Sequence, residues 1–445
     1  MRTSIPLLFT ALLFSCATHA QQKIKTIAGT GAGDFGGDGF VSTGGRLHSP
    51  RDIKLDASGN VYILDYENFR IRRINAATGI IVTVAGNGVI GYTGDGSIGT
   101  SATMWPTGIA VNRNNELYIA DGHSNVIRKL NSLGIISTVA GVGGIGTNTG
   151  NGGPANAATF GLIHGIAFDT ANNLYLADAQ HHVVRKIDAA GIISRYAGDD
   201  TAGYMGDDGP ATTARLDSPY AVVADRAGNV FISDLKAHVV RRVDVTSGII
   251  TTYAGNGTAG FSGDGGLAGS AQLSRPAGLA MDTSGNLYIA DADNNRIRMV
   301  DAAGIITTII GNGTPGFGGD LWYVTGCNLH TPFGVAVNNT GNIYIADALN
   351  QRVRQTYSAV GVADVSKGSE LEIYPNPATG KCVLSGLAKD ETVTIYDLTG
   401  RAISTHTAAG AILDLDITSF APGTYMLRVA TAAGSSRSVA RLVKE

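Results

Sequence analysis

The chain has 445 residues, a formal charge of −3 and 61 glycines, about twice the usual ~7% glycine content. A nearly balanced charge excludes the basic face that a nucleic-acid-binding protein needs. Only three cysteines are present, which excludes a disulfide framework. The composition therefore favours a glycine-rich extracellular all-β protein that apolar packing stabilises.

Residues 1–20 have the pattern of a secretory signal peptide. Arg2 precedes an apolar run, and small residues end at Ala20, directly before Gln21. Lipoprotein cleavage at Cys16 is the alternative, although the bulky Phe14 fits it poorly. No later stretch is apolar enough to cross a bilayer. We expect an exported chain without a transmembrane segment after residue 20.

Residues 21–357 repeat one unit six times. The copy from Pro276 to Gly311 contains the runs GLAMD, NLYIAD, RIRMVD and IITTIIG, separated by the turns TSGN and DAAG. The Asp that ends the second run recurs every 56 or 57 residues, at Asp65, Asp121, Asp178, Asp234, Asp291 and Asp347. Four short strand-like runs per copy predict six four-stranded antiparallel blades in a ring, a β-propeller.

The last copy stops at Tyr357 without its fourth run, and a matching piece, residues 24–29, stands alone before the first copy. The N-terminal strand is therefore predicted to complete the last blade. Residues 24–357 also resemble the NHL repeat, through Pro-x-Gly-Ile-Ala-x-Asp, Gly-Asn-Leu-Tyr-Ile-Ala-Asp and Asn-x-Arg-Ile-Arg-Lys patterns. The resemblance implies a six-bladed propeller, a fold that serves binding proteins and enzymes alike.

A glycine-rich excursion follows the fourth strand of each copy. Four excursions match the dinucleotide fingerprint G-x-G-x-x-G, starting at Gly86, Gly141, Gly255 and Gly311. No helical pattern follows, so we interpret them as repeated turns. Aspartates also recur there, at Asp38, Asp95, Asp207, Asp208, Asp264 and Asp320. Turn chemistry explains them better than calcium binding, and no cofactor is predicted, with calcium or zinc as the alternative.

An arginine follows each strand-ending Asp by seven residues, at Arg72, Arg128, Arg185, Arg241, Arg298 and Arg354. A catalytic residue is needed once, so both series are assigned to blade structure. We expect each Asp to accept backbone N–H bonds in the following loop, and each Arg to pair between strands.

Function is expected where the copies differ, on the face formed by the loops between blades and between second and third strands. At the position after the repeat proline, which Ile163 replaces in the third copy, stand the residues expected at the channel mouth: Arg51, Thr107, His164, Tyr220, Ala277 and Phe333. Two residues beyond the strand-ending Asp stand Glu67, His123, Gln180, Lys236, Asp293 and Leu349. The binding candidates are Arg51, His164, Tyr220, Lys236 and Phe333, joined by Trp322 and Tyr323 of the last excursion.

His164, His181, His182 and His238 are weak metal-ligand candidates. The resemblance implies that some related propellers are metal-dependent lyases or lactonases, and that His182 and His238 occupy a position used for loop hydrogen bonding. The motifs HExxH and G-x-S-x-G are missing from the sequence. No catalytic residue is assigned, and a binding role is favoured over an enzyme.

A linker at 358–369 precedes a second module at 370–445, whose short alternating runs predict a small antiparallel sandwich. Residues 374–378 (YPNPA), 395–401 (IYDLTGR) and 421–427 (APGTYML), with Lys444, resemble the C-terminal sorting domain of the Bacteroidota type IX secretion system. The resemblance implies passage through the periplasm and across the outer membrane by that machinery, with release or surface attachment left open.

The sequence thus predicts an exported propeller that serves as a binding or adhesion module for an extracellular protein, peptide or glycan. The alternative is a metal-dependent lyase or lactonase at the channel mouth.

Overall fold

The computed structural model describes residues 22–358 and 372–444, except 375, 377, 398, 400 and 432–435. The expected signal peptide, the alternative cleavage site at Cys16 and most of the expected linker lie outside the described residues. The chain divides into two compact units, residues 1–358 and 359–445. In the part that the structure describes, no helix is long and apolar enough to span a membrane.

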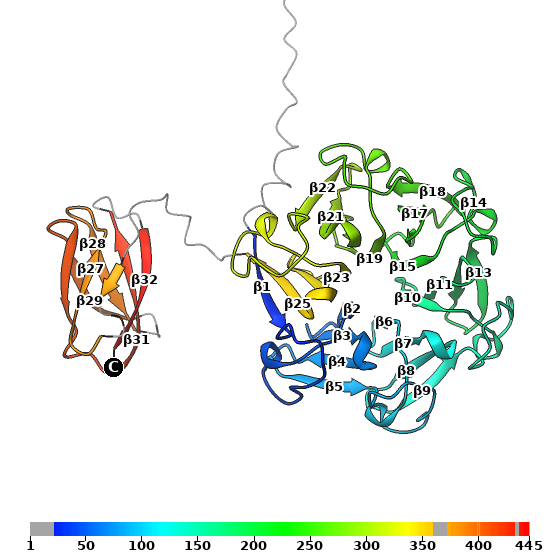
Figure 1. Cartoon of the computed structure of the whole chain (residues 1–445), viewed down its shortest axis with the longest axis horizontal. Coiled ribbons are helices and arrows are strands. Elements are labelled where there is room, and N and C mark those ends of the chain that lie inside the picture. The colour runs from blue at the N-terminus through cyan, green and yellow to red at the C-terminus, as the bar shows by residue number, and fades with distance from the viewer. Residues whose placement is uncertain are drawn as a thin grey trace, which may run out of the picture. The chain divides into compact units, whose positions relative to one another are not determined.

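The first unit is a ring of six antiparallel sheets (Figure 1), which confirms the predicted six-bladed propeller. The first five blades are β2 (Pro50–Leu55), β3 (Val61–Asp65), β4 (Arg70–Ile74) and β5 (Ile81–Ala85); β6 (Gly108–Val111), β7 (Leu117–Asp121), β8 (Val126–Leu130) and β9 (Ile136–Ala140); β10 (Ile163–Phe168), β11 (Leu174–Asp178), β12 (Val183–Ile187) and β13 (Ile193–Ala197); β15 (Pro219–Ala224), β16 (Val230–Asp234), β17 (Val239–Val243) and β18 (Ile249–Ala254), with β14 (Gly209–Pro210) added at the edge; and β19 (Pro276–Met281), β20 (Leu287–Asp291), β21 (Arg296–Val300) and β22 (Ile306–Ile310).

The last blade contains strands from both ends of the unit. Its order is β1 (Gln22–Ala28), β25 (Arg352–Ser358), β24 (Ile343–Asp347) and β23 (Pro332–Val337). In the antiparallel register of β1 and β25, Ile24 lies opposite Thr356. The N-terminal strand therefore closes the ring.

Neighbouring blades share apolar clusters because the strands are rich in aliphatic residues that face both ways. Ile53, Ile63 and Ile81 of the first blade pack with Ala346 and Val353 of the last, and comparable clusters join the other neighbouring blades. Each blade thus buries its faces against the next, as a repeat without a core of its own must.

Every blade also contains a buried Asp at the end of its second strand and a buried Arg in its third strand. We call these two residues the Asp–Arg frame. Arg72 and Asp65 are both fully buried, with Nη1 and Oδ2 3.2 Å apart, while the Nη2 of Arg72 lies 2.6 Å from Asp38 of the preceding excursion. The equivalent arginine-to-excursion pairs are Arg128–Asp95, Arg241–Asp207, Arg298–Asp264 and Arg354–Asp320. Five of the six excursion aspartates that were weighed above as calcium ligands, all except Asp208, are thus ion-paired with these arginines.

The strand-ending Asp differs from its expected role in the first and last blades. Asp65 accepts the backbone N–H of His48, at 2.7 Å, and Asp347 accepts that of His330, also at 2.7 Å. Both donors lie in the segment just before the first strand of the same blade. In these two blades the backbone N–H bond therefore comes from the preceding segment, and the following loop binds the other carboxylate oxygen through the side chains of Asn68 and Asn350. In the third blade Asp178 does accept the backbone N–H of His181 in the following loop, as expected.

The excursions run along the outer strand of the next blade, where Ile98 bridges to Ile135 and Leu267 to Ile305. In the described excursions the only helices are 3-10 helices of three residues. No longer helix follows a G-x-G-x-x-G motif there, so these motifs are repeated turns. These helices, with the equivalent ones after second strands, are η1 (Ser42–Gly44), η2 (Tyr66–Asn68), η3 (Gly99–Ser101), η4 (Gly122–Ser124), η5 (Ala155–Ala157), η6 (Ala211–Thr213), η7 (Ala268–Ser270), η8 (Ala292–Asn294), η9 (Val324–Gly326) and η10 (Ala348–Asn350).

The second unit consists of two antiparallel sheets, as a small sandwich requires. They are β26 (Glu372–Tyr374), β27 (Lys381–Ser385) and β30 (Ile412–Asp416), and β29 (Ala402–Thr407), β28 (Thr392–Tyr396), β31 (Gly423–Ala430) and β32 (Ser436–Lys444). Leu384 and Leu415 of the first sheet share one core with Val393, Ile395 and Leu427 of the second.

Candidate functional site

The first strands β2, β6, β10, β15, β19 and β23 surround the central channel of the propeller (Figure 1). Glycines let them approach closely. A Cβ on Gly108 would lie 1.9 Å from the backbone oxygen of His164, and one on Gly165 would lie 2.5 Å from that of Tyr220. The enclosed part of the channel has a volume of about 20 Å³, room for about one water molecule. A larger ligand must therefore bind at an open end of the channel, and the end at which the copies differ is the mouth formed by the residues after the repeat proline.

Aromatic rings and one arginine gather at this mouth. The His164 and Tyr220 ring centroids are 4.9 Å apart, and those of Tyr220 and Phe333 are 5.8 Å apart. The guanidinium carbon of Arg51 lies 5.3 Å from the centroid of Phe333 and 3.7 Å from that of Tyr66. We call these five residues the mouth cluster. Four of them, all except Tyr66, are among the seven binding candidates chosen from the sequence.

Arg51 is held by ring stacking and one weak ion pair. Its Nη2 lies 3.9 Å from the Glu67 carboxylate, beyond hydrogen-bond distance. Its Nε is buried without a hydrogen-bond partner among the described residues. Arg51 thus presents planar N–H donors that no described side chain engages at close range.

Asp52 and Lys54 line the channel next to Arg51, and neither residue was predicted from the sequence. The Asp52 carboxylate lies 2.5 Å from Lys54 Nζ and accepts the backbone N–H of Ile109 at 3.0 Å. At the position of Asp52 the other copies have Gly108, Gly165, Ala221, Gly278 and Gly334. Comparing the copies one residue further along each first strand would have found this carboxylate.

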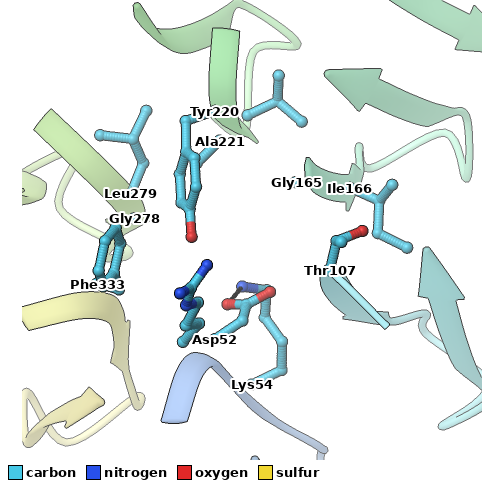
Figure 2. Close-up of a pocket in the computed structure, with 12 residues that line it drawn as sticks. Asp52, Lys54, Thr107, Gly165, Ile166, Tyr220, Ala221, Gly278, Leu279 and Phe333 are labelled. Atoms are coloured by element: carbon cyan, nitrogen blue, oxygen red, sulfur yellow. Dashed lines mark hydrogen bonds and ion pairs between the residues drawn. The ribbon is translucent and has the colours of Figure 1, made fainter. Parts of the chain in front are cut away.

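Burial sets the protonation states at the mouth. Tyr220 is 8% exposed, and its hydroxyl points into the channel (Figure 2). Burial raises the pKa of Tyr220 far above its ordinary value. Burial, aided by the Arg51 charge, lowers the pKa of His164 to about 4. At neutral pH the mouth therefore contains a phenol donor and an uncharged imidazole.

We expect burial of His164 to make the stability of the fold depend on pH, with full stability above the unfolded pKa of 6.5. Because the folded pKa is lower, protons bind the unfolded state more strongly, and this stability is lost as the pH falls from 6.5 toward 4. At pH 5 the loss is about 2 kcal/mol. Urea unfolding of wild type and His164→Gln at pH 7.5 and 5.0 measures it. A wild-type advantage that does not shrink at pH 5.0 would contradict the assignment.

The remaining histidine candidates do not join the mouth cluster. His181 Nδ1 lies 3.0 Å from the Asp178 carboxylate, which raises the pKa of His181. His182 accepts the backbone N–H of Ser218, and His238 that of Arg275. Both therefore make the loop hydrogen bonds that the resemblance implied. Among the residues the structure describes, no group of three or more His, Cys, Asp or Glu is suited to a metal ion.

Three further binding candidates make no contact with the mouth cluster among the interactions of the described residues. Lys236 is exposed and its backbone N–H bonds to Asp217. Trp322 accepts the backbone N–H of Ile24 at 3.1 Å, and Tyr323 bridges to Lys23. The expectation that Trp322 and Tyr323 lie on the mouth face was wrong, because the excursion runs along the outer strand to the start of β1. Both rings remain substantially exposed there, at 68% and 42%.

Trp105 and His123 extend the aromatic surface beside the mouth. Their rings stack with centroids 3.8 Å apart, and Phe69 meets Trp105 edge-on at 5.6 Å. His123 also acts on the pKa of His164 through its charge. The mouth face therefore presents ring surfaces from the first two blades next to Arg51.

Each of the two units contains a match to a known protein family. Residues 254–316 match the teneurin NHL domain family, and residues 372–445 match the secretion system C-terminal sorting domain family. The chain is 30% identical over 285 residues to the protein SUPPRESSOR OF QUENCHING 1 of Arabidopsis thaliana, a match that covers 60% of this chain. The match spans only 27% of that relative.

Solved structures share the propeller fold. A structural genomics protein of unknown function from Bacteroides thetaiotaomicron has a TM-score of 0.59 at 16% identity, with 75% of each chain covered. An auxiliary nutrient binding protein from the same species has a TM-score of 0.54 at 15% identity, covering 76% of this chain and 77% of its own. The sorting domain indicates type IX secretion to the cell surface or extracellular space. The chain is an exported NHL-repeat β-propeller protein with a C-terminal secretion-system sorting domain.

Proposed function

We propose that the propeller binds an extracellular ligand, a glycan, peptide or protein, at the mouth of its central channel. The observation that carries this proposal is the mouth cluster, in which Arg51 and four rings from different blades lie on the face where the copies differ. Aromatic side chains and arginine dominate the energetics of binding surfaces. The shared Asp–Arg frame supplies a rigid support for them.

A nutrient-binding propeller of the same fold is compatible with this role, but the likeness at 15% identity supports the fold alone. The metal-dependent lyase or lactonase alternative needs several ligands that converge on one ion. His181 instead bonds to Asp178, and His182 and His238 each accept a backbone N–H from the segment that precedes the first strand of the next blade. The geometry at the mouth therefore favours binding.

We expect Phe333→Ala to weaken ligand binding by about 10-fold or more, because burying an aromatic ring against a ligand contributes about 1.5–3 kcal/mol. Glycan, peptide and surface-protein arrays probed with the whole exported chain identify the ligand, and calorimetry then compares the variants. Trp322→Ala is the control, since this exposed ring lies at the outer edge of the last blade. Equal losses in both variants, or none in Phe333→Ala, would contradict binding at the mouth.

A further inference from the structure

We propose that the ligand at the mouth is an acidic saccharide, whose ring-borne carboxylate binds the Arg51 guanidinium. This inference rests on the proposed binding function and names the chemical class of its ligand. It follows from the way Arg51 is held, from the charges around it, and from the ring surfaces beside it.

The stacking of Arg51 does not use its N–H donors, and the side chain is 28% exposed. The guanidinium carbon of Arg51 lies 3.7 Å from the ring centroid of Tyr66 and 5.3 Å from that of Phe333. Stacking engages the flat face, whereas all N–H groups of a guanidinium lie in its plane. These contacts therefore fix the orientation of the fork without using its donors. A planar carboxylate is the partner that such a fork binds with two parallel hydrogen bonds.

The local carboxylates do not satisfy this fork. Glu67 is 3.9 Å from Nη2, too far for a hydrogen bond. Asp52 is already engaged by Lys54 and by the backbone of Ile109. The Nε of Arg51 is buried with no hydrogen-bond partner among the described residues, so neither carboxylate engages this donor either.

Tyr220 supplies a second donor at the same place. Its side chain is more than nine-tenths buried, its hydroxyl points into the channel (Figure 2), and none of the hydrogen bonds between described residues involves that hydroxyl. Because burial raises its pKa, the phenol keeps its proton at neutral pH. A ligand oxygen at the mouth therefore meets an O–H donor as well as the guanidinium.

Ring surfaces favour a saccharide over an acidic peptide. Tyr66 and Phe333, which lie against Arg51, and Trp105, which stacks on His123, are half-buried, so each leaves part of its surface to solvent. The C–H face of a sugar ring can cover such a surface while its hydroxyls remain solvated. A uronic acid also holds its carboxylate rigidly on the ring, whereas a flexible Glu side chain loses rotamer entropy when it is fixed.

The test is calorimetric titration of the whole chain with a panel of galacturonate, glucuronate and mannuronate trisaccharides, their methyl esters, a triglutamate peptide and neutral trisaccharides. We expect at least one uronate to bind, and its methyl ester to bind at least 30-fold more weakly. Arg51→Leu should remove most of this preference, and Arg51→Lys should retain part of it. Arg113→Leu, an exposed arginine in the hairpin between β6 and β7, should change nothing.

The outcomes separate the two proposals. Binding of a neutral saccharide that Phe333→Ala weakens, with no uronate bound, would overturn this inference and leave the mouth as the binding site. Binding of triglutamate alone, dependent on Arg51, would overturn the saccharide class. Binding that Phe333→Ala and Arg51→Leu both leave unchanged would overturn the mouth as the site. Thermal unfolding of Arg51→Leu verifies that the variant is folded, and Arg51→Lys provides the same test with the charge retained.

Discussion

Replacing Arg72 with methionine is expected to lower the free energy of unfolding by about 3–5 kcal/mol, the usual loss when one partner of a buried ion pair is removed. Arg72 and Asp65 are fully buried, and Arg72 also binds Asp38. Burial already raises the pKa of Asp65 to about 6, against the opposing effect of the Arg72 charge. Without that charge, the carboxyl must be buried as an unpaired anion or take up a proton.

Urea unfolding at neutral pH measures this effect. Arg46→Met is the matched control, because the Arg46–Asp34 pair is about half exposed and such pairs contribute about 0–1 kcal/mol. The double variant Arg72→Met/Asp65→Asn should recover part of the loss, since it removes the unpaired carboxylate. Equal midpoints for Arg72→Met and Arg46→Met would show that the buried frame does not stabilise the blade.

Gly108→Ala is the second large effect that we expect, a loss of about 3 kcal/mol through overpacking. The new Cβ would lie 1.9 Å from the backbone oxygen of His164, in the neighbouring blade. Backbone atoms cannot turn away as a flexible side chain does, so the two first strands must separate. Binding at the mouth should fall as well, because His164 belongs to the mouth cluster.

Gly44→Ala is the control for Gly108→Ala. A Cβ at Gly44 would meet nothing within 4 Å, so the change in unfolding free energy should stay within about 0.5 kcal/mol. Thermal unfolding of both variants gives the comparison. If Gly108→Ala unfolds at the wild-type temperature, the close approach of the first strands around the channel is not a requirement of the fold.

The repeat predicted the architecture well because each copy contains the whole blade. The Asp at regular spacing marks the end of every second strand, and the lone strand at residues 24–29 marks the ring closure seen in β1. The partners of the excursion aspartates could not be read from the sequence. Asp38 and Arg72 are 34 residues apart in the chain, and only the path of the excursion over the strand end brings them together.

The residues at the mouth could be predicted only in part. Comparing the copies found Arg51, His164, Tyr220 and Phe333, since each occupies the same place in its repeat. Tyr66 was missed because the loop positions considered began one residue later, at Glu67. Trp322 was misplaced because the variability of a loop does not reveal at which end of a blade it lies.

The strand exchange in the last blade has a consequence for how the protein is made. Thr30 and Arg352, joined by a hydrogen bond, lie 322 positions apart, so a chain emerging from its N-terminus leaves β1 unpaired until nearly the whole propeller has appeared. Closing so long a loop is slow rather than prohibitive, since each doubling of length adds only ~0.6 kcal/mol. A product truncated within any blade cannot close its ring and also lacks the sorting domain that follows. Because of the order of the two units, the sorting domain is carried only by chains that contain every strand of the propeller.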